Sequence, residues 1–435
     1  MVMNLEKLSP AIFSKQMMSL AEELFPIARS LTGQGVRDTL GIIRRECKEL
    51  QILTYDSGQK VGDWTIPREW KVNEAYIIDP TGRKICDFHE NNLHLVGYSA
   101  PFKGELELGE LIEHIHYLEK QPEYVPYVTS YYKETWGFCM SFEDFANLKA
   151  GTYQVLVDTE LFSGQMEIGE IVIPGESESE IFLSTYICHP SMANNEVSGP
   201  VLAVFLSNLV RQMDNFYTYR FVFAPETIGS IAYLSTHKDQ LKKNVIAAYN
   251  LTCVGDNRAF SFLPSRYGNT VSDRAAKQTL ANYNYVYKEY SWLDRGSDER
   301  QYCSPGVDLP MASLMRSKYG EYPEYHTDSD RLHSVVTGEG LFESLQLHLR
   351  VIEQLESLRF PKATKLGEPL MTKYDLYSTI SKKDAANPRP RDLLDFVSMS
   401  DGTLSVQEIG KAVRISDERA TEIFEQLCDL GLVRC

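Results

Sequence analysis

Several common features are absent from this sequence of 435 residues, and each absence excludes a class of protein. No apolar run approaches the roughly 20 residues that a membrane-spanning helix requires, so we expect no contact with a membrane. The first residues, MVMNLEKLSPAIF, lack the charged and then apolar segments of a signal peptide. We therefore expect the protein to be made and to stay in the cytoplasm.

Paired cysteines and an excess of basic residues are also absent. The eight cysteines are scattered singly without a CxxC pair, so the sequence indicates neither a thiolate zinc knuckle nor a redox dithiol. The 44 Lys and Arg residues stand against 60 Asp and Glu residues, which gives a formal net charge of −16. Because phosphate binding needs a basic surface, this balance argues against a nucleic-acid partner.

Strands and helices alternate through the middle of the chain. Apolar runs predict strands at 153–159, 169–175, 180–190, 219–227 and 247–255, with helices at 199–213 and 231–243 between them. This alternation predicts an α/β fold in which a mixed sheet is sandwiched by helices. Ligands bind at the carboxyl ends of strands in such sheets, and His189, Glu226 and Asp256 each lie at or just beyond the end of one of these runs.

The regions on either side of this pattern indicate further domains. Short alternating runs and turn signals predict an inserted, mostly β domain at 51–145 within an α/β domain made of 1–50 and 146–360. Three short helices and a final strand predict a winged-helix-like domain at 366–435. Residues 391–435 contain nine acidic and five basic side chains, so we favour protein or interdomain contacts over DNA for this domain.

The segment STYICHPSMANNEVSGPVLAVFL holds the first candidate site residue. His189 ends a buried strand, where a neutral imidazole is well placed to bind zinc. A lone histidine at a strand end is more often structural. Here Asn194, Asn195 and Glu196 add oxygen donors within the same loop, which favours a metal site.

Two further segments supply a candidate base and a second histidine. In FVFAPETIGSIAYL, Glu226 ends an apolar strand, where partial desolvation raises a carboxyl pKa toward the range of a general base. Its alternative role is a helix-start carboxylate favoured by the helix dipole. In EYPEYHTDSDRLHSV, His326 has Asp328 and Asp330 as candidates to orient its ring.

The fourth segment, GSDERQYCSPG, places three charged residues between two glycines. Asp298, Glu299 and Arg300 could clamp the amine or carboxylate of a substrate, and a solvated turn is the alternative. We take these three residues and Tyr325 as candidate substrate contacts.

In this order, the segments resemble the di-zinc aminopeptidase family. The matching motifs are the strand-end His189, Ser198-Gly199 in its loop, Pro225-Glu226 and Tyr325-His326-Thr327. More narrowly, the chain resembles a subgroup with an inserted β domain and a C-terminal winged helix that is often linked to polysaccharide biosynthesis. The resemblance implies that His189 and His326 are metal ligands and that Glu226 is the catalytic base.

Three ligand positions of the family carry neutral residues in this chain. Asn195 stands at the bridging Asp, Thr227 at the second Glu and Thr252 at a further Asp. Two zinc ions would lack the carboxylate that holds their charges together, so we predict one ion. Glu196 or Asp256 is expected to complete this single site with the two histidines.

The sequence therefore predicts a metal-dependent peptidase or amidohydrolase that cleaves an amide bond of a peptide or another small molecule, with zinc as the expected ion. The alternative is a catalytically lapsed binding protein for a peptide or modified sugar, with recognition by the aromatic inserted domain. The sequence leaves open whether the protein forms a homo-oligomer.

Overall fold

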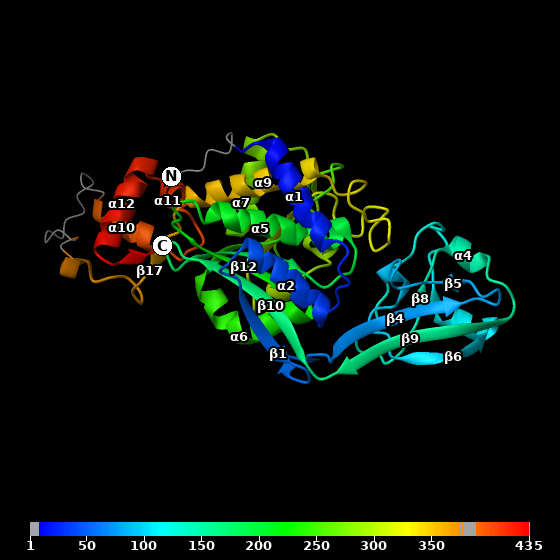
Figure 1. Cartoon of the computed structure of the whole chain (residues 1–435). Helices are drawn as coiled ribbons and strands as arrows, with labels where there is room; N and C mark the ends of the chain where they lie inside the picture. The colour runs from blue at the N-terminus through cyan, green and yellow to red at the C-terminus, as the bar shows by residue number, and fades with distance from the viewer. Residues whose placement is uncertain (1–7, 375, 377–388, 435) are drawn as a thin grey trace.

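The computed structural model describes residues 8–374, 376 and 389–434, which form three units in a row (Figure 1). The central unit contains an eight-stranded sheet in the order β1-β10-β12-β11-β13-β16-β14-β15. Its strands are β1 (Gln51–Asp56), β10 (Gln165–Ile173), β11 (Glu180–Tyr186), β12 (Thr218–Ala224), β13 (Val245–Asn250), β14 (Ser261–Leu263), β15 (Lys288–Glu289) and β16 (Met311–Met315). Strands β12, β11, β13 and β16 are parallel, whereas β1, β10 and β14 introduce antiparallel pairs. The predicted mixed sheet is confirmed.

Helices cover both faces of this sheet, as the sequence predicts. One face packs against α1 (Pro10–Leu24), α2 (Gln34–Glu46), α5 (Ser198–Val210), α7 (Val271–Asn282) and α9 (Gly338–Glu356). The other face packs against α6 (Ile228–Asn244) and α8 (Glu299–Tyr302). All seven residues of β11 are buried, because a central parallel strand is covered on both sides.

The inserted unit is built on a second sheet in the order β5-β4-β9-β6. Its elements are β4 (Glu69–Ile78), β5 (Lys84–Ile85), η2 (Asn92–His94), β6 (Phe102–Glu107), α3 (Leu108–Leu111), η3 (Ile112–His114), β7 (Ile115–His116), β8 (Phe138–Cys139), α4 (Phe142–Ala146) and β9 (Thr152–Phe162). The hairpin of β2 (Lys60–Val61) and β3 (Trp64–Thr65) precedes this unit.

Near the domain boundary, two strands join a different sheet from the one that the sequence predicts. The sequence assigned residues 51–145 to the inserted domain, but β1 pairs with β10 of the central sheet and β9 pairs with β4 of the inserted sheet. A local pattern of alternating residues identifies a strand without identifying the sheet that it joins. We therefore propose that the inserted domain extends from β4 to β9.

The C-terminal unit has its own apolar core. It contains α10 (Arg389–Ser398), α11 (Val406–Val413), α12 (Asp417–Asp429) and β18 (Val433–Arg434), and β18 pairs with β17 (Lys362–Ala363). The predicted order of three helices and a strand is therefore present, and residues 375 and 377–388 of this unit lie outside the described residues.

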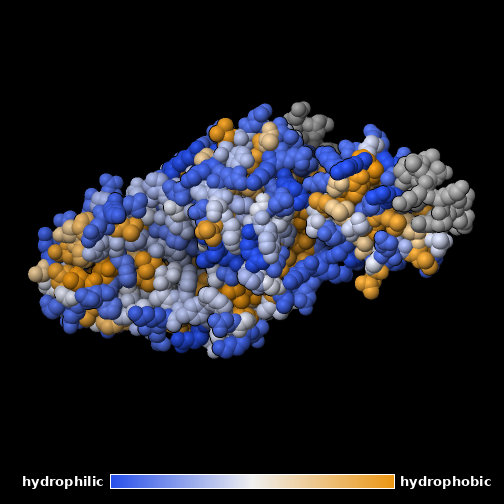
Figure 2. All heavy atoms as spheres, turned by 180° about the vertical axis from the view of Figure 1, so that it is seen from behind, coloured by the Kyte–Doolittle hydropathy of each residue, from blue (hydrophilic) through white to orange (hydrophobic). Residues whose placement is uncertain are grey.

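Seen from behind, apolar side chains gather over the inserted and C-terminal units more than over the central unit (Figure 2). None of the described helices is long and apolar enough to cross a membrane.

A buried cluster of charges ties three strands of the central sheet together. Arg220 on β12 donates two hydrogen bonds to Glu180 on β11, at 2.6 and 3.0 Å, and one to Glu170 on β10 at 2.6 Å. Tyr233 on α6 also donates to Glu170. All four side chains are buried, so the two carboxylates depend on this one guanidinium for charge balance.

Replacing Arg220 with Met should lower the free energy of unfolding by about 3–5 kcal/mol, because two buried carboxylates lose their cation. Urea unfolding followed by circular dichroism measures this change. The control is Lys71→Met, which breaks an exposed pair with Glu160 and should cost less than about 1 kcal/mol. Equal effects of the two substitutions would contradict the assigned role of the cluster.

Candidate active site

The first candidate residue, His189, follows β11 at the carboxyl edge of the parallel strands. Its Nδ1 lies 2.9 Å from Glu196 Oε2, and Glu196 belongs to η4, a π-helical turn at Ala193–Val197. An ionised Glu196 only accepts hydrogen bonds, and in that state Nδ1 carries the ring proton and Nε2 holds the free lone pair. Arg29 lies behind this pair, with Nε 3.6 Å from Glu196 Oε1 and hydrogen bonded to the His189 carbonyl at 3.0 Å.

Glu226 is presented by a turn of unusual backbone geometry. Thr227 has φ 65° and ψ −72°, and the N–H of Ile228 donates to the Glu226 carbonyl at 2.8 Å. This is a γ-turn with positive φ, which is strained for a β-branched residue by about 1–3 kcal/mol. Asp298 Oδ1 stabilises the turn by accepting the N–H of Thr227 at 2.7 Å. Glu226 Oε2 then lies 3.6 Å from His189 Nε2.

His326 lies in the loop before α9, and its side chain lines the same cavity as His189 and Glu226. Its ring stacks on Tyr325 with 3.9 Å between the centroids, and its Nε2 lies 3.1 Å from Asn195 Oδ1. Asn195 Nδ2 donates to the Tyr186 hydroxyl at 2.8 Å, so Oδ1 is the acceptor that faces His326. The two imidazole centroids are 5.5 Å apart. Burial lowers the pKa of both His189 and His326 to about 3, so both rings are neutral.

These groups open into one cavity of about 360 Å³ between the central and inserted units. His189, Glu226 and His326 form its polar side. Its apolar and aromatic side is contributed largely by the insert and the preceding hairpin: Trp64, Tyr127, Thr129, Tyr131 and Tyr132. The cavity therefore joins a polar floor to an aromatic wall, as in sites for small organic ligands.

Backbone hydrogen bonds fix the aromatic wall against the loop of His326. The N–H of Tyr127 donates to the His326 carbonyl at 2.8 Å. The N–H of Val125 donates to the Asp328 carboxylate, and the N–H of Asp328 donates to the Val125 carbonyl, each at 2.9 Å. The inserted unit is thus part of the site, since its chain pairs with the residues that carry the second histidine.

Two carboxylates that the sequence placed among the metal ligands have other positions. Glu196 faces Nδ1 of His189, on the side of the ring away from Glu226, and therefore orients the ring. Asp256 accepts four hydrogen bonds, from Asn194 Nδ2, the N–H of Arg258 and both the N–H and the hydroxyl of Ser317. Its lone pairs are used in holding loops together, and it has no bond to either histidine.

The side chains predicted to contact a substrate also have hydrogen-bond partners within the protein. Glu299 is buried and accepts from the N–H groups of Gly296 and Ser297 and from the Tyr319 hydroxyl. Asp298 supports the turn at Thr227, and the exposed Arg300 donates to the Thr227 hydroxyl at 3.1 Å. Asp298 and Arg300 therefore brace the turn of Glu226, Glu299 holds its own loop against Tyr319, and Tyr325 braces the ring of His326.

Sequence reasoning missed Arg29 and did not connect Tyr127, Tyr131 and Tyr132 to the histidines. An arginine within an otherwise apolar helical region is a weak signal for a buried cation. The tyrosines belong to the aromatic stretch VPYVTSYYKETWGF, whose composition favours ligand recognition without indicating which cavity it lines.

At two positions where the zinc aminopeptidase pattern has an acid, Asn195 and Thr252 form hydrogen bonds between neutral groups. Thr252 Oγ1 lies 2.6 Å from the Tyr186 hydroxyl, which in turn accepts from Asn195 Nδ2. Among the described residues, the one set of three His, Cys, Asp or Glu side chains with ligand atoms within 4.8 Å is Cys188, His189 and Glu196. Arg29 already balances that set, and Cys188 Sγ accepts the N–H of Glu226. Two zinc ions therefore do not fit this donor set.

One ion fits better. The 3.1 Å between His326 Nε2 and Asn195 Oδ1 is close to the separation of about 3.3 Å between two ligands of one zinc ion. His189 Nε2 is a further donor on the same cavity, and the bond from Nδ1 to Glu196 orients it there.

The fold and this edge of the sheet define an aminopeptidase-like protein with a C-terminal winged helix. A family described as a domain of unknown function (DUF4910) matches residues 18–358, and a winged helix-turn-helix family matches residues 359–435. The chain belongs to the DUF4910 family.

Relatives support this assignment. A Clostridium acetobutylicum protein, provisionally named a polysaccharide biosynthesis protein with an aminopeptidase-like domain, is 40% identical over 395 residues, 90% of this chain and 89% of its own. A solved structure from Clostridium acetobutylicum, provisionally described as a peptidase, has a TM-score of 0.79 at 36% identity and covers 98% of this chain and 97% of that chain. The zinc aminopeptidase BSAP of Bacillus subtilis shares the fold, with a TM-score of 0.59 at 13% identity over 80% of this chain and 95% of that chain. The predicted resemblance is confirmed.

Replacing Asp256 with Asn should cost about 2–4 kcal/mol of stability, because an amide NH₂ would face donors that now bind an oxygen. Metal content of the folded protein should stay unchanged, as elemental analysis can measure. The control, Asp239→Asn, alters a side chain that is 96% exposed and should change stability by less than about 0.5 kcal/mol. Loss of metal from a folded Asp256 variant would instead make this residue a ligand.

Proposed function

We propose that this protein hydrolyses an amide bond of a peptide or related small molecule in the cavity between the central and inserted units. The observation that carries the proposal is the convergence of His189, Glu226 and His326 on one cavity, from three separate segments of the chain. Residues with only structural roles have no need to share a solvent-accessible cavity.

Backbone strain around the cavity supports an active site over a lapsed one. Ser191, Thr227, Cys253 and His326 all have positive φ, between 41° and 65°, and all lie in the loops that form the site. Each such residue costs stability, by about 1–3 kcal/mol where the strain is large. Strain that is kept in several loops at one place favours a function that needs this geometry.

We further propose that one metal ion, with zinc the best match, is held by His189 and His326 together with Asn195. When bound, the ion would act as a Lewis acid on the scissile carbonyl. Glu196 orients the His189 ring through Nδ1, as a carboxylate beside a metal-binding histidine commonly does. Both imidazoles are neutral and so have lone pairs to offer.

Glu226 is the proposed general base. Burial, followed by repulsion from Asp298, holds the pKa of Glu226 well above its usual range, which suits a carboxylate that accepts and returns a proton near neutral pH. The proton would come from the attacking water and pass to the leaving amine. Trp64 and the three tyrosines would bind an apolar side chain of the substrate and exclude water.

Protein purified without chelators should contain about one equivalent of a transition metal, measured by mass spectrometry of the elements. His189→Ala and His326→Ala should each lose most of it, because each removes one of the two imidazole ligands. The control is His348→Ala in α9, whose ring nitrogen bonds the Ser344 carbonyl away from the cavity and whose loss should leave the metal in place. Less than about a tenth of an equivalent in the wild type would refute the metal site.

The substitution Glu226→Gln should lower hydrolysis of a panel of aminoacyl-4-nitroanilides by at least about 100-fold while metal content stays constant. Gln keeps the shape of the side chain but cannot take up the proton. Glu324→Gln is a matched control, because Glu324 lies in the loop of His326 but pairs with Arg258 outside the cavity. Equal activity of wild type and the Glu226 variant would exclude this residue as the base.

The second candidate function is a binding protein for a peptide or modified sugar. It is favoured by one observation: the hydrogen bonds among Asn195, Tyr186 and Thr252 are complete without any ion. In that case the aromatic wall would bind the ligand, and Glu226→Gln would leave ligand affinity unchanged.

We infer that the C-terminal winged helix serves protein or interdomain contacts. Helix α12, which occupies the place of a recognition helix, carries five acidic side chains and one arginine. That charge would repel the phosphates of DNA.

A further inference from the structure

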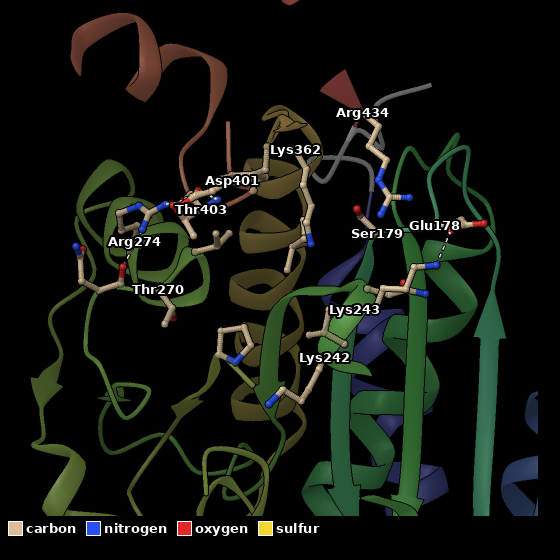
Figure 3. Close-up of a pocket in the computed structure, with 18 residues that line it drawn as sticks. Glu178, Ser179, Lys242, Lys243, Thr270, Arg274, Lys362, Asp401, Thr403 and Arg434 are labelled. Atoms are coloured by element: carbon tan, nitrogen blue, oxygen red, sulfur yellow. Dashed lines mark hydrogen bonds and ion pairs between the residues drawn. The ribbon is translucent and has the colours of Figure 1, made fainter. Parts of the chain in front are cut away.

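A second cavity, of about 380 Å³, lies at the junction of the central unit and the winged helix. It opens at the amino ends of β11 and β13, where Ser179 and Val245 line it, and so lies at the opposite edge of the sheet from His189. The C-terminal unit closes it with Lys362, Gly402 and Arg434 (Figure 3). The cavity is therefore built by two domains and is distinct from the candidate active site.

The lining is basic in a chain whose net charge is −16. Five cationic side chains face two acidic ones: Lys242, Lys243, Arg274, Lys362 and Arg434 against Glu178 and Asp401. Such a concentration of positive charge attracts anions.

Most of these charges already have partners within the protein. Lys243 pairs with Glu178 at 3.5 Å, and Lys242 donates to the Gly306 carbonyl at 2.7 Å. Arg274 pairs with Glu408 at 2.8 Å and thereby docks the winged helix. These contacts account for three cations and one acid in terms of the fold alone.

Lys362 and Arg434 are different. They are directly opposite each other in the antiparallel pair β17–β18, where like charges destabilise the pairing. Neither has an ion pair or a side-chain hydrogen bond with any residue in the described ranges. Figure 3 shows both side chains extending into the cavity from the winged-helix side, with Lys242 and Lys243 across from them. Both side chains are exposed, and Asp401, the other acid of the lining, forms no ion pair with either of them among the described residues. These two unpaired cations favour an anion that comes from outside the chain.

The opposite wall is formed by the start of helix α7, with its N-cap Thr270 and first residue Val271 on the cavity lining. The buried carboxylate of Asp273 already caps this helix, so the attraction for an anion rests on the basic side chains. An arginine and a lysine side by side suit a doubly charged phosphate better than a single carboxylate.

We propose that this cavity binds a phosphate-bearing small molecule, of sugar-phosphate to nucleotide size, with Lys362 and Arg434 on the phosphate. The volume lies within the range of ligand sites of about 300–1,000 Å³. Because the ligand contacts β17 and β18 on one side and α7 on the other, its binding also stabilises the docking of the winged helix on the central unit.

The test uses the full chain and isothermal titration with inorganic phosphate, glucose 1-phosphate and UMP, with glucose as the uncharged control. At least one phosphate compound should bind with a dissociation constant below about 1 mM, and glucose should not bind. The double substitution Lys362→Ala/Arg434→Ala should weaken binding at least tenfold. Lys71→Ala/Arg83→Ala removes two exposed cations of the inserted unit and should leave affinity unchanged.

Thermal unfolding without ligand separates a binding role from a structural one. The Lys362/Arg434 double variant should be as stable as the wild type or more stable, because a repulsion is removed. No binding of any phosphate compound up to about 10 mM would overturn the proposal. So would equal loss of affinity in both double variants, or a clear loss of stability in the first.

Discussion

The candidate site depends on the hydrogen bonds that the carboxylate of Asp330 accepts. It is fully buried and accepts the N–H groups of Asn194 and Asn195 at 2.8 and 3.0 Å and the hydroxyl of Tyr322 at 3.0 Å. Its own carbonyl accepts the N–H of Ala193. The π-helical turn beside His189 therefore gets its hydrogen-bond partners from the loop that carries His326. A buried carboxylate is tolerated only with such donors, so the turn and the loop form together.

This clamp explains why two histidines remain together although the acids of the zinc aminopeptidase pattern are missing. The site is held by backbone bonds to Asp330 and by the Arg29–Glu196 pair, and neither requires a metal. Asn195, Thr227 and Thr252 are neutral, so these positions add no negative charge that would attract a cation. Arg29 lies beside Glu196, and Glu226 is the one acidic residue of the cavity lining, which favours the single ion proposed above over two.

The sequence predicted the central fold well because its evidence is local or periodic. Buried strands such as β11 are continuous apolar runs, and strand ends pointed to His189 and Glu226, which line one cavity. The predictions for Glu196 and Asp256 rested on nearness in sequence to a lost acid, which says nothing about side-chain direction. Glu196 faces the other nitrogen of His189, and Asp256 holds Asn194 and Ser317. Likewise, Asp328 and Asp330 bind backbone groups rather than the His326 ring.

The position of Tyr127 follows from long-range pairing between the insert and the His326 loop, which no local pattern encodes.

The two cavities lie at opposite ends of the same parallel strands, and this arrangement limits how they can influence each other. Strand β11 runs from Glu180, beside the basic cavity, to the segment of His189, and all its side chains are buried. The Arg220 cluster fixes the amino end of β11 against β12 and β10. A close-packed sheet tied in this way resists sliding of one strand past another. Motion is easier at the domain junctions, where fewer buried contacts hold the units together. A ligand in the basic cavity would therefore act first on the position of the winged helix, and a ligand in the histidine cavity on the position of the inserted unit.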